Sequence, residues 1–206
     1  MHWRPAQHED QDALYSVCLL SADAGYEDPA DARTFEDEQI LGDVYVGPYL
    51  HYPDAVAFTL VDEAHPVGYL LAVPDTYQFD VWSESQWWPI LRARYPKPPP
   101  RTREAWTGDQ WAADLIHSPS KLPPAIVETY PAHFHIDLLA SARGHGFAGD
   151  QVRELLALLK SGDIPGVHLR MESGNANARS FYEYLGFREI TTLAGEVILG
   201  ASLSHD

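Results

Sequence analysis

The sequence predicts an α/β fold in which a mixed sheet is flanked by helices, and three patterns indicate it. Two apolar runs at 55–61 and 67–73, joined by a short polar turn, are typical of an antiparallel hairpin. A strand at 134–139, a glycine-rich turn, an amphipathic helix and a second strand at 167–171 form a β-α-β unit. Two closing strands are expected near the C-terminus.

The first part of the chain predicts a short strand and two helices. Residues 3–5 are expected to form the opening strand. Acidic residues at 8–12 would lie in the first turn of a helix, where the helix dipole favours negative charge. Residues 23–37 are polar and turn-rich and predict a loop, and a second helix is expected over 35–44.

Residues 74–131, between the third and fourth strands, differ in composition from the rest. They hold ten of the 16 prolines and five of the six tryptophans. Because such an aromatic content argues against a disordered linker, short helices are expected at 83–95 and 103–116. The segment is interpreted either as a second core that covers the sheet or as a lid that walls a substrate site. Residues 1–206 are thus expected to form one domain with this insertion.

Two helices are expected after the fourth strand. The apolar stripe of the first runs from Val152 to Leu159 and stops at Ser161-Gly162. The second runs over 175–185 and ends at Gly186, since glycine commonly follows the last helical residue.

Composition excludes several classes of protein. The one cysteine, Cys18, allows neither an intramolecular disulfide nor a cysteine metal cluster. No signal peptide and no run of roughly 20 apolar residues is found, so a cytoplasmic protein without membrane contact is expected. The net charge of −16 disfavours nucleic acid as a partner. It favours a cationic acceptor, unless it serves solubility alone.

A glycine-rich turn at 144–149 is the first candidate binding element. Glycines let the backbone approach a ligand, and the amides at a helix start attract an anion such as pyrophosphate. The pattern Gly144-x-Gly146-x-x-Gly149 matches a dinucleotide fingerprint. That fingerprint should follow the first strand, with an acidic residue ending the second. Since neither condition is met, the dinucleotide interpretation is disfavoured.

The same loop, written as Arg143-x-x-Gly146-x-Ala148, resembles the Q/R-x-x-G-x-G/A loop of GCN5-related N-acetyltransferases. The segment from Asn175 to Phe187 is similar at every fixed position to a second family segment, N-x-x-A-x-x-x-Y-x-x-x-G-F. The two blocks have the family's order and spacing and cover about residues 132–200. The resemblance implies a mixed, mostly antiparallel sheet whose fourth and fifth strands splay apart.

A closer resemblance is to the acetyltransferase-like C-terminal region of O-GlcNAcase. It rests on three short segments: Trp3-Arg4-Pro5-Ala6, Phe134-His135-Ile136-Asp137 and Val197-Ile198-Leu199-Gly200. In the animal enzymes this region lacks an intact glycine loop and is regarded as a pseudo-acetyltransferase, whereas this chain keeps the loop. Nothing here resembles the glycosidase domain, so a stand-alone protein of bacterial type without sugar hydrolysis is expected.

The family resemblance implies acetyl-coenzyme A (acetyl-CoA) as the cofactor. Ile136, Asp137 and Leu138 would pair with the pantetheine amides, and the Leu138 amide would face the thioester carbonyl. Asn175 would contact the cofactor or cap its helix, and Arg179 would reach a phosphate or stay in solvent. The residues expected around the pyrophosphate are Arg143, Gly144, His145, Gly146, Phe147, Ala148 and Gly149.

Acetyl transfer to an amine needs a base for the amine and an acid for the departing thiolate. The resemblance implies Tyr182 as the acid, since a phenol holds its proton more tightly than a thiol; its alternative role is packing on the cofactor's sulfur. Because alternate strand residues share a face, His133, His135 and Asp137 project together. Asp137 is the preferred base, followed by Glu172 and His135. The three strand residues are also a candidate zinc or iron site, which the neighbouring transferase motif disfavours.

Three functions compete at this point. The leading hypothesis is an acetyl-CoA-dependent N-acetyltransferase acting on an amine of a small molecule or peptide. The second is a non-catalytic acetyl-CoA-binding pseudo-acetyltransferase or interaction module. The third is a protein-binding domain that never meets coenzyme A. The sequence leaves a homodimer open.

Overall fold

A single seven-stranded sheet of order β1-β2-β3-β4-β5-β7-β6 lies at the centre of the computed structural model, which describes residues 1–22, 33–100, 106–193 and 195–204. Every neighbouring pair is antiparallel except β4 and β5, which run parallel. The predicted α/β class, hairpin and β-α-β unit are therefore confirmed. The strands are β1 (His2–Pro5), β2 (Val56–Asp62), β3 (His65–Val73), β4 (Ala132–Leu138), β5 (Gly166–Glu172), β6 (Arg188–Leu193) and β7 (Glu196–Ser202).

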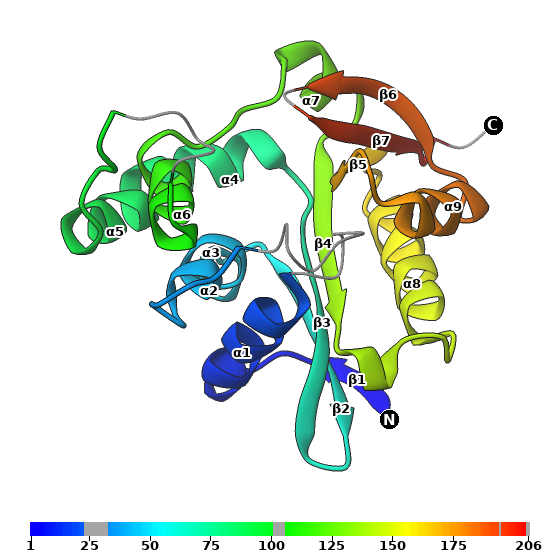
Figure 1. Cartoon of the computed structure of the whole chain (residues 1–206). Coiled ribbons are helices and arrows are strands. Elements are labelled where there is room, and N and C mark those ends of the chain that lie inside the picture. The colour runs from blue at the N-terminus through cyan, green and yellow to red at the C-terminus, as the bar shows by residue number, and fades with distance from the viewer. Residues whose placement is uncertain (23–32, 101–105, 194, 205–206) are drawn as a thin grey trace.

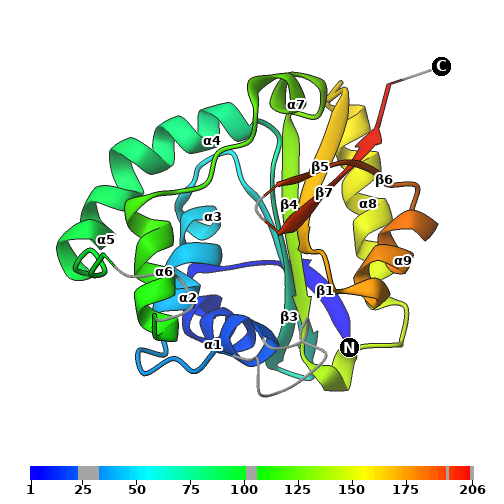
Figure 2. The same cartoon turned by 45° about the horizontal axis from the view of Figure 1, so that its top comes forward.

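Helices cover both faces of this sheet (Figures 1 and 2). One face carries α1 (Gln11–Ser21), α2 (Ile40–Tyr45), α3 (Gly47–His51), α4 (Thr76–Trp82), α5 (Trp88–Arg94) and α6 (Gly108–His117). The other carries α8 (Phe147–Ser161) and α9 (Ala176–Tyr184), while α7 (Pro124–Thr129) leads into β4. Among the described residues, no helix is long and apolar enough to cross a membrane.

The alternation of side chains along β3 divides the core into two clusters. Tyr69, Leu71 and Val73 face α1, α2 and the insertion. Leu70 and Ala72 point the other way, into a cluster shared with α8, β4, β5 and β7. Because both faces of β3 are buried, its sequence is a continuous apolar run rather than an alternating one.

The helix α2 begins at Ile40, five residues later than the sequence predicted. The Asp37 carboxylate accepts a hydrogen bond from the Gln39 amide at 2.8 Å, which holds a turn before the helix. Of the predicted loop at 23–37, residues 23–32 lie outside the described residues.

The insertion helices also begin at different places from those expected. The first helix starts at Thr76 rather than 83, because the Asp75 carboxylate caps it by accepting from the Gln78 amide at 3.0 Å. A π-helical turn, Ser83–Trp87, joins it to α5. The second begins at Gly108 because Thr107 and Gln110 form a capping box. Residues 103–105 of the helix expected at 103–116 lie outside the described part of the chain.

Side chains of the insertion belong to the same buried cluster as α1 and α2. Phe79, Trp88, Leu91 and Ile116 are all less than a tenth exposed there. The insertion thus extends the core on that face of the sheet, while its role as a lid stays a prediction.

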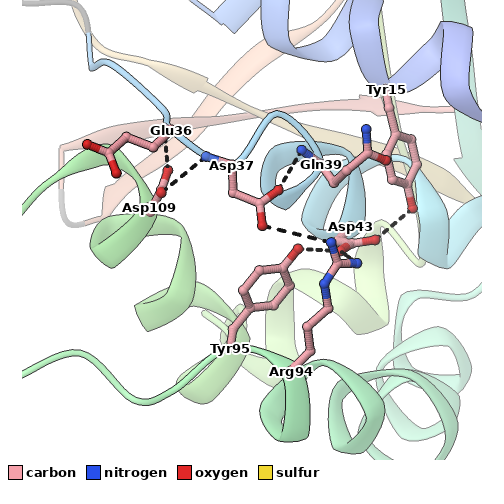
Figure 3. Close-up of polar contacts among 8 residues, drawn as sticks. All are labelled: Tyr15, Glu36, Asp37, Gln39, Asp43, Arg94, Tyr95 and Asp109. Atoms are coloured by element: carbon pink, nitrogen blue, oxygen red, sulfur yellow. Dashed lines mark hydrogen bonds and ion pairs between the residues drawn. The ribbon is translucent and has the colours of Figure 1, made fainter.

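A buried carboxylate, Asp43, connects α1, α2 and α5 (Figure 3). Its Oδ1 accepts from the Tyr15 hydroxyl at 3.0 Å, and its Oδ2 accepts from Tyr95 at 2.7 Å and from Arg94 Nη1 at 2.9 Å. Its backbone carbonyl accepts from Trp87 Nε1 at 2.9 Å. Burial raises the pKa of both Tyr15 and Tyr95, and the Asp43 charge raises each further, so both phenols remain protonated donors.

A second carboxylate holds the segment before α2 against α6. Asp109 accepts from the backbone amides of Glu36 at 3.1 Å and Asp37 at 3.2 Å (Figure 3). The Asp37 carboxylate in turn lies 3.8 Å from Arg94 of α5. The two carboxylates therefore fix the position of Phe35, which lines the cavity described below.

Two histidines, the partly buried His133 and the buried His168, join the sheet to the elements around it. Thr76 Oγ1 donates its one proton to the Pro131 carbonyl at 2.7 Å, so it accepts from His133 Nδ1 at 2.7 Å. Tyr49 then donates to Nε2 of His133, also at 2.7 Å. His168 Nδ1 donates to the Tyr130 carbonyl at 2.7 Å. Burial lowers the pKa of His133 well below its ordinary value and that of His168 to about 4, so both rings are neutral at pH 7.

We predict that Asp43→Asn lowers the free energy of unfolding by about 2 kcal/mol, because an amide group replaces an oxygen that accepts from buried donors. Urea denaturation measures the change. Arg94 is half exposed, so most of the loss should come from the tyrosine hydrogen bonds. The control is Glu183→Gln, which breaks the exposed 3.8 Å pair with Arg179 and should cost less than about 1 kcal/mol. Equal effects would contradict the proposed importance of Asp43.

We predict that stability falls as pH decreases from about 6.5 towards 4. In this pH window the histidines of the unfolded chain bind protons, whereas His133 and His168 stay neutral in the folded chain. Unfolding therefore becomes more favourable as the pH falls. His168→Asn keeps a donor for Tyr130 but cannot titrate. It should reduce the slope of unfolding free energy against pH by up to about 1.4 kcal/mol per pH unit. An unchanged slope in His168→Asn would refute the argument.

Candidate functional site

The strands β4 and β5 pair only at their beginnings. Ala132 pairs with Val167 and His133 pairs with His168. No further pair between these two strands follows among the described residues. Beyond these residues β4 continues to pair with β3, and β5 with β7. The sheet therefore opens in its middle, as the predicted splay of the fourth and fifth strands requires.

The free edge of β4 presents backbone groups to this opening. Leu139 donates its N–H to the Val67 carbonyl of the β3 side at 2.9 Å. Because successive residues of a strand direct their N–H groups to opposite edges, the amides of Leu138 and Ile136 point into the gap towards β5. These amides are available to an extended chain of amides or to a carbonyl oxygen.

A cavity of about 300 Å³ lies in this opening and is lined from both faces of the sheet. From the α9 face come Asn175, Ala178 and Tyr182. From the face of α1, α2 and the insertion come Cys18, Phe35, Leu41, Tyr45 and Trp111. The strands contribute Phe134, His135, Ile136, Asp137, Arg170, Met171 and Glu172. The cavity thus connects the two sides of the molecule through the sheet.

The three predicted catalytic residues all line this cavity. Asp137 accepts from the Tyr69 hydroxyl at 2.6 Å, and burial raises the pKa of the Asp137 carboxyl. Burial also raises the pKa of Tyr182, and the Asp137 charge adds to that rise. Glu172 is exposed at the end of β5. Neither the Tyr182 hydroxyl nor the Glu172 carboxylate has a hydrogen-bond partner within the described ranges.

The third candidate base, His135, faces the same side of β4 as Asp137. Burial, followed by the charge of Arg170, lowers the pKa of His135 to about 4. Its ring meets the Tyr45 ring edge-on at a centroid distance of 5.9 Å. His135 is therefore a neutral hydrogen-bonding group at pH 7.

The glycine loop leads into α8 at one end of the gap. Gly144 and Gly146 have φ values of +79° and +85°, and the space beside each Cα is open. Gly146 is the N-cap of α8, whose first amides are oriented as a phosphate-binding site requires. Arg143 Nε donates to the Leu138 carbonyl at 2.8 Å, which places the guanidinium between the gap and the loop.

Two other residues predicted at the site have structural partners. Asn175 caps α9 by accepting from the Ala178 amide at 2.9 Å, and it also lines the cavity. Arg179 lies 2.8 Å from Glu189 and 3.8 Å from Glu183. Its guanidinium is thus used in surface ion pairs, which agrees with the alternative that the sequence left open.

Sequence reasoning missed three residues that shape the site. Tyr69 orients Asp137, Tyr45 walls the cavity, and Trp3 donates from Nε1 to the Phe147 carbonyl at 3.0 Å, which anchors the first turn of α8. A tyrosine within the buried run at 67–73 was a usable signal, because a buried phenol needs a polar partner. The Trp3 contact spans 144 residues and left no signal of that kind.

The alternative of a metal site on β4 finds no geometric support. Both ring nitrogens of His133 are engaged by hydroxyls. Within the described ranges, no group of three or more His, Cys, Asp or Glu side chains is arranged to hold a metal ion.

Comparison with known proteins gives a consistent set of relatives. A model of the FR47-like protein family matches residues 128–194. O-GlcNAcase of Mus musculus is 25% identical over 204 residues, which cover 97% of this chain. The crystal structure of SsHAT is 32% identical, with a TM-score of 0.85 over 99% of this chain and 98% of that chain. A PaiA N-acetyltransferase of Thermoplasma acidophilum, in complex with coenzyme A, is 12% identical with a TM-score of 0.56 over 98% of both chains, a likeness of fold alone.

The extent of each match decides what it shows. The chain spans only 22% of the length of the mouse relative, so the activity named for that protein stays with that protein. The likeness to SsHAT covers nearly the whole of both chains at 32% identity. On that match this chain belongs to the GCN5-related N-acetyltransferase superfamily, and within it to the relatives of the acetyltransferase-like part of O-GlcNAcase.

Proposed function

We propose that this chain is an acetyl-CoA-dependent N-acetyltransferase that acts on the amine of a small molecule or peptide. The observation that carries the proposal is the cavity that crosses the gap between β4 and β5. It would let a thioester bound on the α8 and α9 side meet an amine bound on the α1 and α2 side. A binding site confined to one face would lack this connection.

The chain's own groups fit coenzyme A along the gap. The amides of Ile136 and Leu138 would pair with the amides of the pantetheine arm. The loop from Arg143 to Gly149 would hold the pyrophosphate at the start of α8, where the open space beside Gly144 and Gly146 leaves room for phosphate oxygens. The Nη groups of Arg143 have no partner in the described part of the chain, so they are available to a phosphate.

Bound acetyl-CoA would supply an activated acyl thioester, and the protein would manage two protons. As the amine nitrogen bonds to the acetyl carbon and the carbon–sulfur bond breaks, Asp137 takes the proton that the nitrogen loses. Tyr182 gives its proton to the departing sulfur and regains one from solvent. Because burial raises the pKa of Asp137, its carboxylate is a stronger base than an exposed one. The Leu138 amide would stabilise charge on the carbonyl oxygen.

The insertion would form the acceptor side of this site. Trp111 of α6 lines the cavity, and Asp109 of the same helix fixes the segment that carries Phe35. We therefore propose that residues 74–131 wall the acceptor pocket within one domain formed by residues 1–206.

A non-catalytic acetyl-CoA-binding module is the second candidate, and one observation favours it. Asp137 is already hydrogen-bonded to Tyr69, and burial lowers the pKa of His135 to about 4. Of the three candidate bases, only Glu172 is both exposed and without a hydrogen-bond partner among the described residues. This candidate expects tight binding of acetyl-CoA and no thiol release over a broad panel of amines.

We predict that Tyr182→Phe lowers kcat about 100-fold, because the departing thiolate loses its proton donor. A thiol-release assay measures the rate, and calorimetry should give an acetyl-CoA affinity within about twofold of the parent. The matched control is Tyr184→Phe on the same helix, at a side chain that is 78% exposed, and it should keep full activity. A Tyr182→Phe variant as active as the control would remove the phenol from the mechanism.

We predict that Gly146→Ala weakens coenzyme A binding at least tenfold and costs about 1 kcal/mol of stability, since a Cβ is strained at positive φ. Titration calorimetry and thermal unfolding measure the two effects. Gly195→Ala is the matched control, because Gly195 has a φ of +89° on the β6–β7 turn and nothing close to its Cα. It should cost similar stability and leave the affinity for coenzyme A intact. If both variants bind coenzyme A normally, the glycine loop does not hold its pyrophosphate.

A further inference from the structure

The acceptor side of the cavity has two levels of opposite chemistry. Counted along the two strands from the last paired residues, His133 and His168, Arg170 corresponds to His135 and Glu172 to Asp137. Their neighbours on β5, such as Leu169 and Met171, belong to the cluster on the α8 face, so these four side chains share the acceptor face. Two residues of strand separate the levels by roughly 7 Å.

The inner level consists of hydrogen-bond donors. The Tyr45 hydroxyl and the His135 ring line the cavity, and neither has a hydrogen-bond partner among residues that the structure describes. Arg170 adds a positive charge, although its guanidinium also contacts Ser120 at 2.9 Å and Glu196 at 3.3 Å. A carboxylate placed here would receive hydrogen bonds from a phenol and an imidazole beside a guanidinium.

The outer level consists of carboxylates. Asp137 lines the cavity, and its Oδ2 accepts from Tyr69, which leaves Oδ1 without a hydrogen-bond partner among the described residues. Glu172 lies across the gap from it without a partner in the described ranges. These oxygens would attract an ammonium group and hold its nitrogen beside Tyr182, where acetyl transfer would occur.

We propose that the acceptor is a small zwitterion, an amine that carries its own carboxylate, with the carboxylate at Tyr45, His135 and Arg170 and the nitrogen at Asp137 and Glu172. The inference rests on the proposed acetyltransferase function and names its substrate class. A volume of about 300 Å³ fits a molecule of amino-acid size.

The net charge of the molecule disfavours a free anion as the acceptor and does not oppose a zwitterion. A protein with a net charge of −16 repels free anions and attracts polycations non-specifically. A zwitterion is neutral overall, so that long-range field neither excludes it nor selects it. The inner level would then select it by the hydrogen bonds that a lysine side chain or an alkylamine cannot accept.

The test uses two matched sets of ligands titrated into the protein with coenzyme A bound. One set is phenylalanine, phenethylamine and 3-phenylpropionate, and the other is β-alanine, propylamine and propionate. Quenching of tryptophan fluorescence reports binding, because Trp111 lines the cavity, and calorimetry provides a second readout. The first ligand of each set carries both an amine and a carboxylate, the second carries only the amine, and the third carries only the carboxylate. Thiol release from acetyl-CoA is measured with the same amines.

The zwitterion of at least one set should bind at least tenfold tighter than either of its single-charge analogues. Tyr45→Phe should weaken the zwitterion and the carboxylate about fivefold and leave the amine unaffected, while Glu172→Gln should weaken the zwitterion and the amine. The matched control Tyr77→Phe, at an exposed side chain on α4, should change none of these affinities.

The outcomes separate this inference from the proposed function. If a zwitterion binds but no thiol is released, the inference about the ligand stands and the proposed acetyltransferase activity is contradicted. If the simple amines cause thiol release at rates equal to or above those with the zwitterions, the acetyltransferase activity stands and the inference about a zwitterionic acceptor is contradicted. Failure of both zwitterions to bind at millimolar concentration, or an unaffected Tyr45→Phe variant, would also overturn it.

Discussion

The separation of β4 from β5 after His133 and His168 is the constraint on which the rest of the structure depends. A strand in the middle of a sheet normally has its amides paired on both edges, and unpaired buried amides are costly. Here β4 keeps full pairing with β3 and leaves its other edge open at the centre of the molecule. The open edge is compatible with a stable fold if a ligand with its own amides completes the pairing.

The two helical layers keep this opening from closing. On one side, the rings of Phe134, Tyr182 and Phe187 pack together at centroid distances of 5.8–6.1 Å, with Tyr182 edge-on to both phenylalanines. On the other, the buried Asp43 fastens α1, α2 and α5 to one another. The walls of the gap are thus set by packing between helices and strands, and not by pairing between the two strands that border it.

The sequence predicted what local periodicity and motif spacing encode. The strands, the glycine loop and the helix that ends before Gly186 were found because each signal lies within a short stretch of neighbouring residues, and the β-α-β unit follows from their order along the chain. Helix starts were less accurate, since Asp75 and Thr107 act as caps only in a particular backbone geometry. The roles of Tyr69 and Trp3 were missed because their partners are 68 and 144 residues away. The whole acceptor wall depends on such contacts.

The acidic composition favours a cationic acceptor, whereas the side chains of the cavity favour a zwitterion. The side chains of the cavity are the stronger evidence. Net charge acts through water and is screened within about 8 Å at physiological ionic strength. Inside the gap, burial lowers the pKa of both His135 and His168, and the nearby charge of Arg170 lowers each further. A ligand in the cavity is exposed to that local positive field and to the nearby carboxylates at once. The chemistry of an acceptor bound in the cavity would therefore be set by a few side chains of β4, β5 and α2, whatever the charge of the remaining surface.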